Sequence, residues 1–224
     1  MTALLLKIIA VVSMIVDHAG AIFFPRCMIH IFGYTIYPLR VFGRLAFPIY
    51  CFLLIEGIRH TSNWKKYAIR LAILAFISEV PFDLALFGGI TWKYQNVFFT
   101  LLLGLLAVQC DLELQKRNHY GEGIIVFLIA AFIAWKMHTD YGAFGIVFIM
   151  VFYYLRNNLS LITLGIGAIG LYMGMSEPFC VAAIIPIACY NGKQGYKSKA
   201  LQLTWYFIYP IHLILFAIIK RFII

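Results

Sequence analysis

The chain has 224 residues, of which 63% are hydrophobic and 12% are charged. This charged fraction is about half of what is usual in a soluble domain, so the composition excludes a water-soluble globular protein. The formal net charge of +9 comes from 18 Lys and Arg residues that are scattered through short polar stretches and form no basic block. The charge therefore does not indicate a nucleic-acid partner, and it fits the loops between membrane helices.

Apolar runs that are long enough to cross a membrane recur along the whole chain, since a spanning helix needs about 20 mostly apolar residues. The sequence predicts an all-α fold, a polytopic transmembrane bundle of about nine helices that forms a single domain over residues 1–224. The predicted helices are 4–24, 41–58, 67–87, 95–111, 122–137, 140–155, 159–175, 178–190 and 201–219. The fifth, sixth and eighth are short, so the alternatives for one of them are a re-entrant segment or a merger with a neighbouring helix, and the total can range from eight to ten.

The orientation follows from the distribution of basic residues between the two sets of loops. A cytoplasmic N-terminus places nine Lys and Arg residues in cytoplasmic loops and six outside. We therefore expect a multi-pass protein of the cytoplasmic membrane with its N-terminus in the cytoplasm. The first helix imitates a signal peptide with a cleavage site at Ala19-Gly20-Ala21, but we expect it to be retained, because Asp17 and His18 lie just before that site and further apolar helices follow it.

The five cysteines are odd in number, contain no C-x-x-C pair and mostly lie in apolar runs. We interpret them as small buried hydrophobic residues and expect neither a disulfide framework nor a metal site. The histidines and carboxylates likewise show no spacing typical of metal ligands.

Ionisable residues inside the predicted helices are the main functional signal, because a charge at the bilayer centre costs about 2.5–3.5 kcal/mol and usually faces a partner or a water-filled cavity. Under the predicted orientation most of them, with neighbouring polar residues, lie at or outside the membrane centre. We expect this polar set to line a cavity toward the extracytoplasmic side. Its members are Asp17, His18, Arg44, Glu79, Asp83, Gln95, Asn96, Asp140, Tyr141, Glu177, Tyr209 and His212.

Lys7 and His18 are eleven residues apart on the first helix, which returns to within about 20° of the same face and separates them by about 16 Å along the axis. The imidazole of His18 suits a general base, and Lys7 suits the binding of a phosphate-bearing donor, with a simple positive-inside anchor as the alternative. Asp17 points about 100° away from His18. A carboxylate from another helix, Glu79 or Asp83, is therefore the better candidate to orient His18.

Glu79 and Asp83 have a structural alternative, which is an ion pair with Arg70 or Arg44. Glu56, Arg59 and His60 mark a cytoplasmic helix end that is either structural or part of the donor site.

Several polar motifs in these apolar runs resemble the TraX family from the first helix to the last. They are Leu6-Lys7-Ile8 through Asp17-His18-Ala19-Gly20, Gly43-Arg44-Leu45-Ala46-Phe47-Pro48-Ile49, Glu56-Gly57, Ser78-Glu79-Val80-Pro81-Phe82-Asp83, Gln95-Asn96-Val97-Phe98-Phe99-Thr100-Leu101 and Tyr209-Pro210-Ile211-His212. That family includes the enzyme that acetylates the N-terminus of conjugative pilin, and it is similar to the transmembrane acyltransferases. In those proteins a basic residue and a histidine are separated by ten residues in an early helix, as Lys7 and His18 are here.

The resemblance implies an acyl-CoA-dependent acetyltransferase that takes acetyl-CoA from the cytosol and acetylates an amine or hydroxyl of an extracytoplasmic peptide or glycan. The expected catalytic residues are His18, Asp17, Glu79 and Asp83, with no metal. The expected donor-binding residues are Lys7, Arg44, Glu56 and Arg59. Gln95, Asn96, Asp140, Tyr141, Tyr209 and His212 are expected at the acceptor or oxyanion.

Several alternatives stay open at this level. Arg44, Asn96 or Tyr209 can each supply the oxyanion donor, and transfer through an acetyl-histidine is an alternative to direct transfer. The same buried acids and histidines also fit a proton-coupled transporter, although the chain shows no internal repeat. A non-enzymatic membrane component of a conjugation or secretion apparatus is the third hypothesis. Neither the acceptor nor the oligomeric state follows from the sequence.

Overall fold

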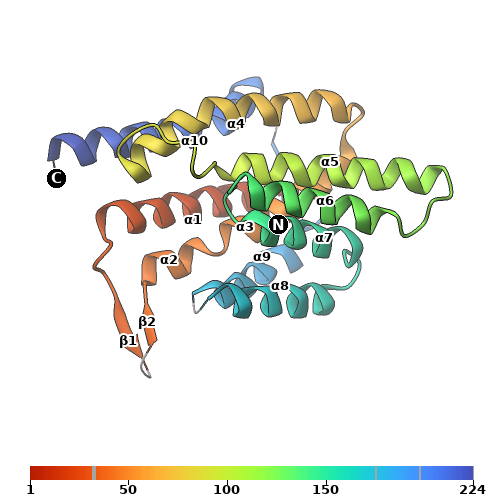
Figure 1. The fold of residues 1–224 in the computed structure, drawn as a ribbon, viewed down its shortest axis with the longest axis horizontal. Coiled ribbons are helices and arrows are strands. Elements are labelled where there is room, and N and C mark those ends of the chain that lie inside the picture. The colour runs from red at the N-terminus through yellow and green to blue at the C-terminus, as the bar shows by residue number, and fades with distance from the viewer. Residues whose placement is uncertain (32–33, 175, 197, 224) are drawn as a thin grey trace.

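The fold comes from a computed structural model that describes residues 1–31, 34–174, 176–196 and 198–223. Within these residues the chain forms ten α-helices, one 3-10 helix and one two-stranded hairpin (Figure 1). In chain order the elements are α1 (Ala3–Phe23), β1 (Ile29–Ile31), β2 (Tyr34–Ile36), α2 (Pro38–Gly43), α3 (Ala46–His60), α4 (Trp64–Phe87), α5 (Val97–Lys116), α6 (Gly123–Lys136), α7 (Gly142–Tyr154), α8 (Leu159–Met173), the 3-10 helix η1 (Glu177–Ala183), α9 (Ile184–Ala188) and α10 (Lys199–Ile223).

Each of the nine predicted helices coincides with a helical segment of the structure. The second is divided into α2 and α3, and the eighth consists of η1 followed by α9. The largest boundary difference is at the end of α5, which continues to Lys116 where the prediction ended at 111. Its polar last turns are stabilised within the helix, because Gln115 donates to Asp111 over 2.7 Å and Lys116 donates to Glu113 over 2.7 Å.

Four stretches are long and apolar enough to cross a membrane: Ala3–Phe23, Pro38–His60, Val97–Lys116 and Leu203–Phe222. They make the chain a multi-pass membrane protein. The helices Gly123–Lys136, Gly142–Tyr154, Leu159–Met173 and Glu177–Ala188 are apolar but shorter. At 1.5 Å per residue, a helix of this class extends over about 20 Å, whereas the hydrocarbon core of a bilayer is about 30 Å thick.

The outward face of α4 is apolar and its inward face carries acids, which is the reverse of a surface helix in a soluble protein. Its outward face carries large exposed apolar side chains, whereas Glu79 and Asp83 point inward and are 7% and 1% exposed. A helix that turns apolar groups outward and acids inward is suited to a lipid environment. The exposed apolar side chains of α4 include Ile69, Ile73, Phe76, Ile77, Val80, Leu84 and Phe87.

The structure confirms the predicted all-α class and adds one short hairpin that was not predicted. Antiparallel strands β1 and β2 pair in the register Ile29 with Ile36, His30 with Thr35 and Ile31 with Tyr34. The segment was predicted as a loop because it is too short for a spanning helix, yet its β-branched and aromatic residues favour extended pairing. In Figure 1 the hairpin projects away from the helices at the lower left.

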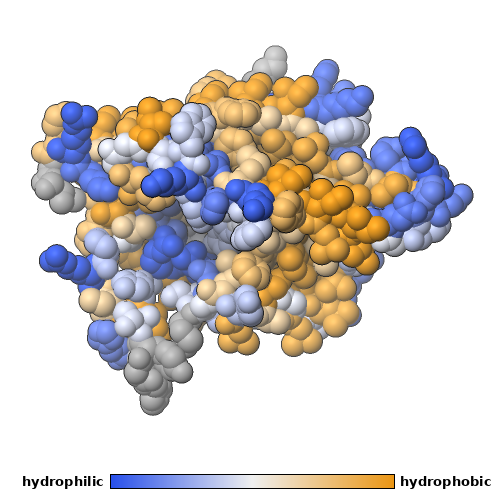
Figure 2. Space-filling model, viewed as in Figure 1, coloured by the Kyte–Doolittle hydropathy of each residue, from blue (hydrophilic) through white to orange (hydrophobic). Residues whose placement is uncertain are grey.

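The helices lie roughly along one direction, and tight connections reverse the chain between them (Figure 1). We call the end at which α1 and α4 finish and α5 begins the hairpin end; α3, α5 and α7 finish at the opposite end. Figure 2 shows apolar side chains over much of the centre and right of this face, with polar side chains at the far right, across the left part and in a small group near the centre. An apolar surface of this extent is suited to contact with the lipid chains of a bilayer.

The cysteine prediction is only partly correct. Cys51 and Cys180 are buried, but Cys27, Cys110 and Cys189 are exposed, and all five are free thiols. Cys110 is exposed although it lies in an apolar run, because α5 turns part of its surface outward beside Leu106.

Candidate functional site

Two histidines from the two ends of the sequence form the centre of the candidate site. His18 on α1 and His212 on α10 are 8% and 7% exposed, and their rings stack with an interplanar angle of 9°. The Nδ1 atom of His18 lies 2.8 Å from Nε2 of His212. This contact connects α1 to α10 toward the hairpin end of the bundle.

The hydrogen bonds of His212 determine which nitrogen of His18 is available. The Nδ1 atom of His212 lies 2.8 Å from the carbonyl oxygen of Ile208, which only accepts, so this nitrogen carries a proton. In the neutral ring, Nε2 of His212 is then the acceptor, and Nδ1 of His18 is the donor. The arrangement leaves Nε2 of His18 with a free lone pair, which is the state that a general base requires.

Tyr209 lies one helical turn before His212 and contacts both imidazoles. Its ring is edge-on to His18 and His212, with centroid distances of 5.8 and 5.4 Å. The side chain is 2% exposed, and its hydroxyl is buried with no hydrogen-bond partner in the described part of the chain. Tyr209 also packs edge-on against Phe98 at 4.7 Å, which links the histidine pair to the start of α5.

Asp17 does not contact the ring of its neighbour His18. Its Oδ2 atom accepts from Arg40 on α2 at 2.8 Å. Gly43 makes this possible, because a Cβ atom at that position would lie 2.2 Å from Oδ1 of Asp17. The pair therefore ties α1 to α2 next to the histidines, as expected from the 100° that separates consecutive helix positions.

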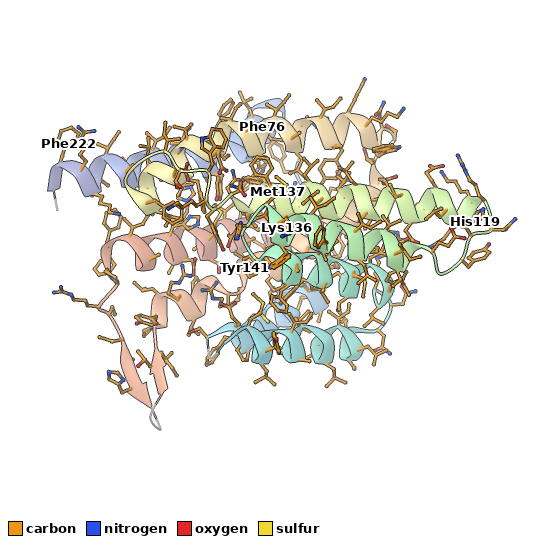
Figure 3. All side chains as sticks on the ribbon, viewed as in Figure 1. Phe76, His119, Lys136, Met137, Tyr141 and Phe222 are labelled. Carbon is orange, nitrogen blue, oxygen red and sulfur yellow. The ribbon has the colours of Figure 1, made fainter. Side chains whose placement is uncertain are left out.

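Arg44 is a second cation at this end, and unlike Arg40 it is buried, with 8% exposure between α2 and α3. Its Nε atom lies 3.0 Å from a carboxylate oxygen of Glu177, and its Nη1 atom donates to the hydroxyl of Tyr141 at 3.2 Å. Tyr141 stacks on Phe47 with a centroid distance of 3.9 Å. Figure 3 shows Tyr141 within the bundle at the start of α7, far from His119 at the opposite end.

The backbone of Tyr141 is in the left-handed region, with φ 62°. A non-glycine residue in this conformation costs of order 1 kcal/mol and is held there by its surroundings. Here the Phe47 ring and the Arg44 guanidinium fix its side chain. Such strain concentrates at functional sites.

The loops before α5 and α7 pair with each other beside Tyr141. The amide of Asp140 donates to the carbonyl of Gln95 at 2.8 Å, and the hydroxyl of Thr100 donates to the Asp140 carbonyl at 2.5 Å. Tyr94 donates to the Asp140 carboxylate at 3.2 Å. Partial burial and the Asp140 charge raise the pKa of Tyr94, and burial raises the pKa of Asp140. Tyr94 therefore keeps its proton as a donor.

The two acids of α4 bind the α4–α5 connection instead of His18. Asn96 donates to Oε2 of Glu79 from its side-chain amide at 2.5 Å and from its backbone amide at 3.1 Å. The side-chain oxygen of Asn96 accepts from the amide of Phe98 and so caps α5. Asp83 accepts from the backbone amide of Thr91 at 2.7 Å. His212, rather than either carboxylate, is thus the group that orients His18. No ion pair of Glu79 or Asp83 with Arg70 or Arg44 is present among the described residues.

Three of the four predicted donor-binding residues, Lys7, Glu56 and Arg59, are separated from this cluster. Lys7 is exposed on the first turns of α1, while His18 is buried, so the two share a helix but not an environment. Glu56 is 6% exposed near the end of α3 and pairs with Arg156 at 2.7 Å; Arg59 is 3.9 Å from the same carboxylate oxygen. Arg44, in contrast, belongs to the hairpin end.

Sequence reasoning missed three participants. They are Arg40, Arg156 and Tyr94, and all three lie outside the helices that were expected from the sequence. Each ends near a buried or half-buried acid. The only signal in the sequence was that buried acids on other helices lacked a partner of opposite charge.

The comparisons with known proteins agree along nearly the whole chain. The family model described as TraX protein matches residues 3–220. The probable fimbrial assembly protein FimC, serogroup H1, of Dichelobacter nodosus is 28% identical over 247 aligned residues, which cover 99% of this chain and 96% of the relative. The uncharacterized protein RP591 of Rickettsia prowazekii (strain Madrid E) is 25% identical over 153 residues, which cover 66% of this chain and 53% of the relative. No solved structure matches.

Proposed function

This chain belongs to the TraX family, and on that premise we propose that it is a membrane-embedded acetyltransferase. The donor is acetyl-CoA from the cytosol, and the acceptor is an amine or hydroxyl on the extracytoplasmic side. The hairpin end faces the extracytoplasmic side in this proposal, and the opposite end faces the cytosol. The nine predicted helices then each cross the membrane or a thinned part of it.

The observation that carries the proposal is the hydrogen bond between His18 and His212. It gives a buried imidazole one fixed donor and one free lone pair, and polar groups from the α2–α3 connection, from α5 and from the residues before α7 gather at the same end of the bundle. A structural histidine needs no such second imidazole. A general base needs both an orienting acceptor and an unprotonated nitrogen.

The reaction follows from this arrangement. Nε2 of His18 accepts the proton of the acceptor amine or hydroxyl as its nitrogen or oxygen attacks the thioester carbonyl carbon. The carbon–sulfur bond then breaks, and the CoA sulfur leaves with the proton that His18 returns to it. The Tyr209 hydroxyl has no hydrogen-bond partner among the described residues, and its side chain is buried beside His18. It is the best-placed donor to the carbonyl oxygen as negative charge develops there.

The other hairpin-end residues hold this centre. Asp17 with Arg40 fixes α1 against α2, and Glu79 with Asn96 fixes the start of α5 beneath Phe98 and Tyr209. Asp83, Gln95, Asp140 and Tyr141 shape the acceptor side, with Arg44 as a second cation.

A peptide acceptor is favoured over a glycan. The Dichelobacter nodosus relative is named a probable fimbrial assembly protein, and we extend this association to the present chain by placing its acceptor among the subunits of an extracytoplasmic filament. An N-terminal amine of such a subunit is a suitable nucleophile once His18 removes its proton.

The test uses inverted membrane vesicles from cells that lack the chromosomal copy and express either the wild-type chain or His18→Ala. With acetyl-labelled CoA outside the vesicles, wild-type vesicles should incorporate label into membrane or lumenal material. The His18→Ala vesicles should lose about 10²–10⁴-fold in rate, which is the usual contribution of a general base. Equal rates at equal protein levels and equal thermal stability exclude His18 as the base. If neither the wild-type nor the His18→Ala vesicles incorporate label, and a pH gradient drives uptake of a solute into the wild-type vesicles instead, the protein is a transporter.

A further inference from the structure

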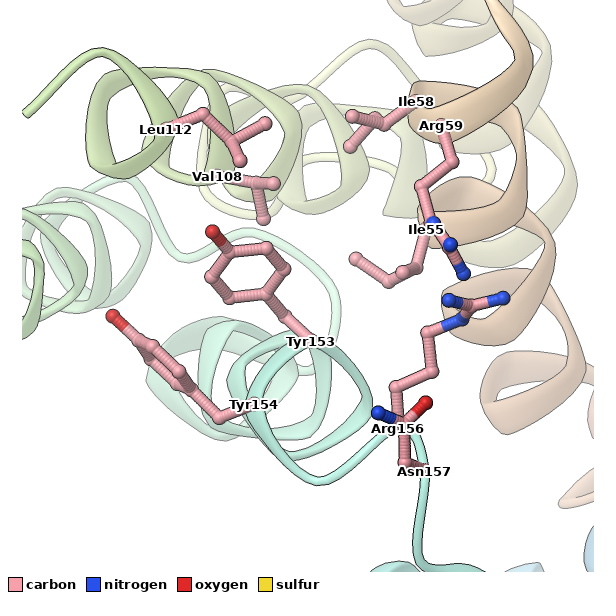
Figure 4. A pocket seen from close by; sticks show the side chains of 9 residues that line it. All are labelled: Ile55, Ile58, Arg59, Val108, Leu112, Tyr153, Tyr154, Arg156 and Asn157. Atoms are coloured by element: carbon pink, nitrogen blue, oxygen red, sulfur yellow. The ribbon is translucent and has the colours of Figure 1, made fainter. Parts of the chain in front are cut away.

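A pocket with a volume of about 300 Å³ opens between α3, α5 and α7 at the opposite end of the bundle (Figure 4). This is at the small end of ligand pockets. Its inner wall is apolar and is formed by Ile55, Ile58, Val108 and Leu112. Its polar lining comes from Arg59, Tyr153, Tyr154, Arg156 and Asn157.

Two guanidinium groups face each other on one side of this pocket (Figure 4). Arg156 makes the closer contact with Glu56, with Nη2 at 2.7 Å and Nε at 3.0 Å from the same carboxylate oxygen. Arg59 is 3.9 Å from that oxygen, and its side chain is 48% exposed. Two cations therefore share one carboxylate, which leaves one positive charge and the exposed Arg59 donors available to an anion.

We propose that this pocket binds a phosphate group that is attached to an apolar or aromatic moiety. Arginine presents its donors in a planar fork that matches phosphate oxygens, and two arginines can hold one phosphate from two sides. The apolar wall accepts the moiety that carries the phosphate, and the aromatic side chains of Tyr153 and Tyr154 line the same pocket.

Two sources supply this chemistry: the phosphorylated end of the acyl donor or the headgroup of a membrane phospholipid. The first rests on the proposed function, and the geometry favours it. Arg59 and Arg44 lie fifteen residues apart across α3, or about 22 Å along its axis. A donor with its phosphate at Arg59 therefore needs a long, thin arm to bring its acyl group to the hairpin end, and coenzyme A has such an arm.

The packing between the two places shows what binding has to change. Leu105 and Ile149 are 0% exposed midway along α5 and α7, and a Cβ atom on Gly104 would lie 2.2 Å from Cδ1 of Ile149. This part of the core is closed around the glycine. An arm that passes between α3, α5 and α7 must displace these side chains.

The experiment measures binding to the purified full chain in lipid nanodiscs. The probes are adenosine 3′,5′-bisphosphate, inorganic phosphate, and nanodiscs with or without phosphatidylglycerol. The variant is Arg59→Gln. It should fold because the Arg59 side chain is half-exposed and its distance to Glu56, 3.9 Å, is too long for a strong ion pair. The control is Arg117→Gln, an exposed arginine at the same end outside this pocket.

We expect Arg59→Gln to weaken binding of the bisphosphate about tenfold or more, since a charge-assisted hydrogen bond is lost, and Arg117→Gln to bind as the wild type does. Retention of phosphatidylglycerol that depends on Arg59, without nucleotide binding, supports the same phosphate site with a lipid as its source. Equal affinities of Arg59→Gln and Arg117→Gln for all probes overturn the proposal. His18→Ala should still bind the bisphosphate, so a failed acetyltransferase test leaves this result independent.

Discussion

Replacement of His212 tests the tautomer argument most directly. His212→Leu removes the acceptor at 2.8 Å from Nδ1 of His18 and leaves a buried N–H group without a partner. Such a group costs about 1–3 kcal/mol. If this cost falls on the transition state, one decade per 1.36 kcal/mol gives a rate loss of about 5–150-fold. The loss should be smaller than that of His18→Ala.

A conservative variant separates positioning from bulk packing. The side-chain amide oxygen of His212→Gln can reach the position of Nε2 and accept from His18, so this variant should recover much of the rate that His212→Leu loses. The readout is label incorporation by inverted vesicles at matched protein levels. Thermal unfolding of each purified variant shows whether the bundle is intact.

The double variant decides the reasoning. If His212 acts only through His18, then His18→Ala combined with His212→Leu should be no slower than His18→Ala alone, because residues that act as a unit are not additive. Multiplied losses in the double variant show that His212 acts on its own. A His212→Gln variant no faster than His212→Leu also contradicts the assigned hydrogen bond.

Two further predictions concern the groups around the histidines. Gly43→Ala should destabilise the bundle by about 1–3 kcal/mol and lower activity, because its Cβ atom would lie 2.2 Å from Asp17. The control is Gly89→Ala, whose Cβ atom meets nothing within 4 Å and which should match the wild type in thermal unfolding. Equal stability of the two variants contradicts the close approach of Gly43 to Asp17. Asn96→Ala removes the α5 cap and a donor to the buried Glu79 carboxylate, so detergent-solubilised protein should lose about 2–4 kcal/mol, and an unchanged unfolding midpoint excludes this role.

The positions of the helices could be predicted from the sequence because each is marked by an apolar run between polar residues. Asn96 illustrates this well: it was expected to open a helix, and its side chain accepts from the amide of Phe98 as the cap of α5. The β-hairpin was missed because its strands have three residues each, too few for a periodic pattern.

The composition of the polar cluster was largely predictable, but its pairings were not. Ionisable residues inside apolar helices stand out because a charge in lipid is costly, so His18, Glu79 and His212 could be named as members of the site. Which of them meet depends on how apolar helices rotate against each other. That rotation is set by close packing and leaves little trace in one sequence. The shared helix face of Lys7 and His18 shows what a single sequence does not reveal, because helical phase alone did not indicate that Lys7 is exposed while His18 is buried.

The link between His18 and His212 joins residues that are 194 positions apart. A ribosome therefore finishes nearly the entire polypeptide before His18 can meet His212. In the proposed mechanism, His18 becomes a competent base only when α10 docks beside α1. Assembly of the bundle is then also the activation step of that mechanism, and we expect a chain cut short before α10 to be inactive even when its earlier helices are correctly placed.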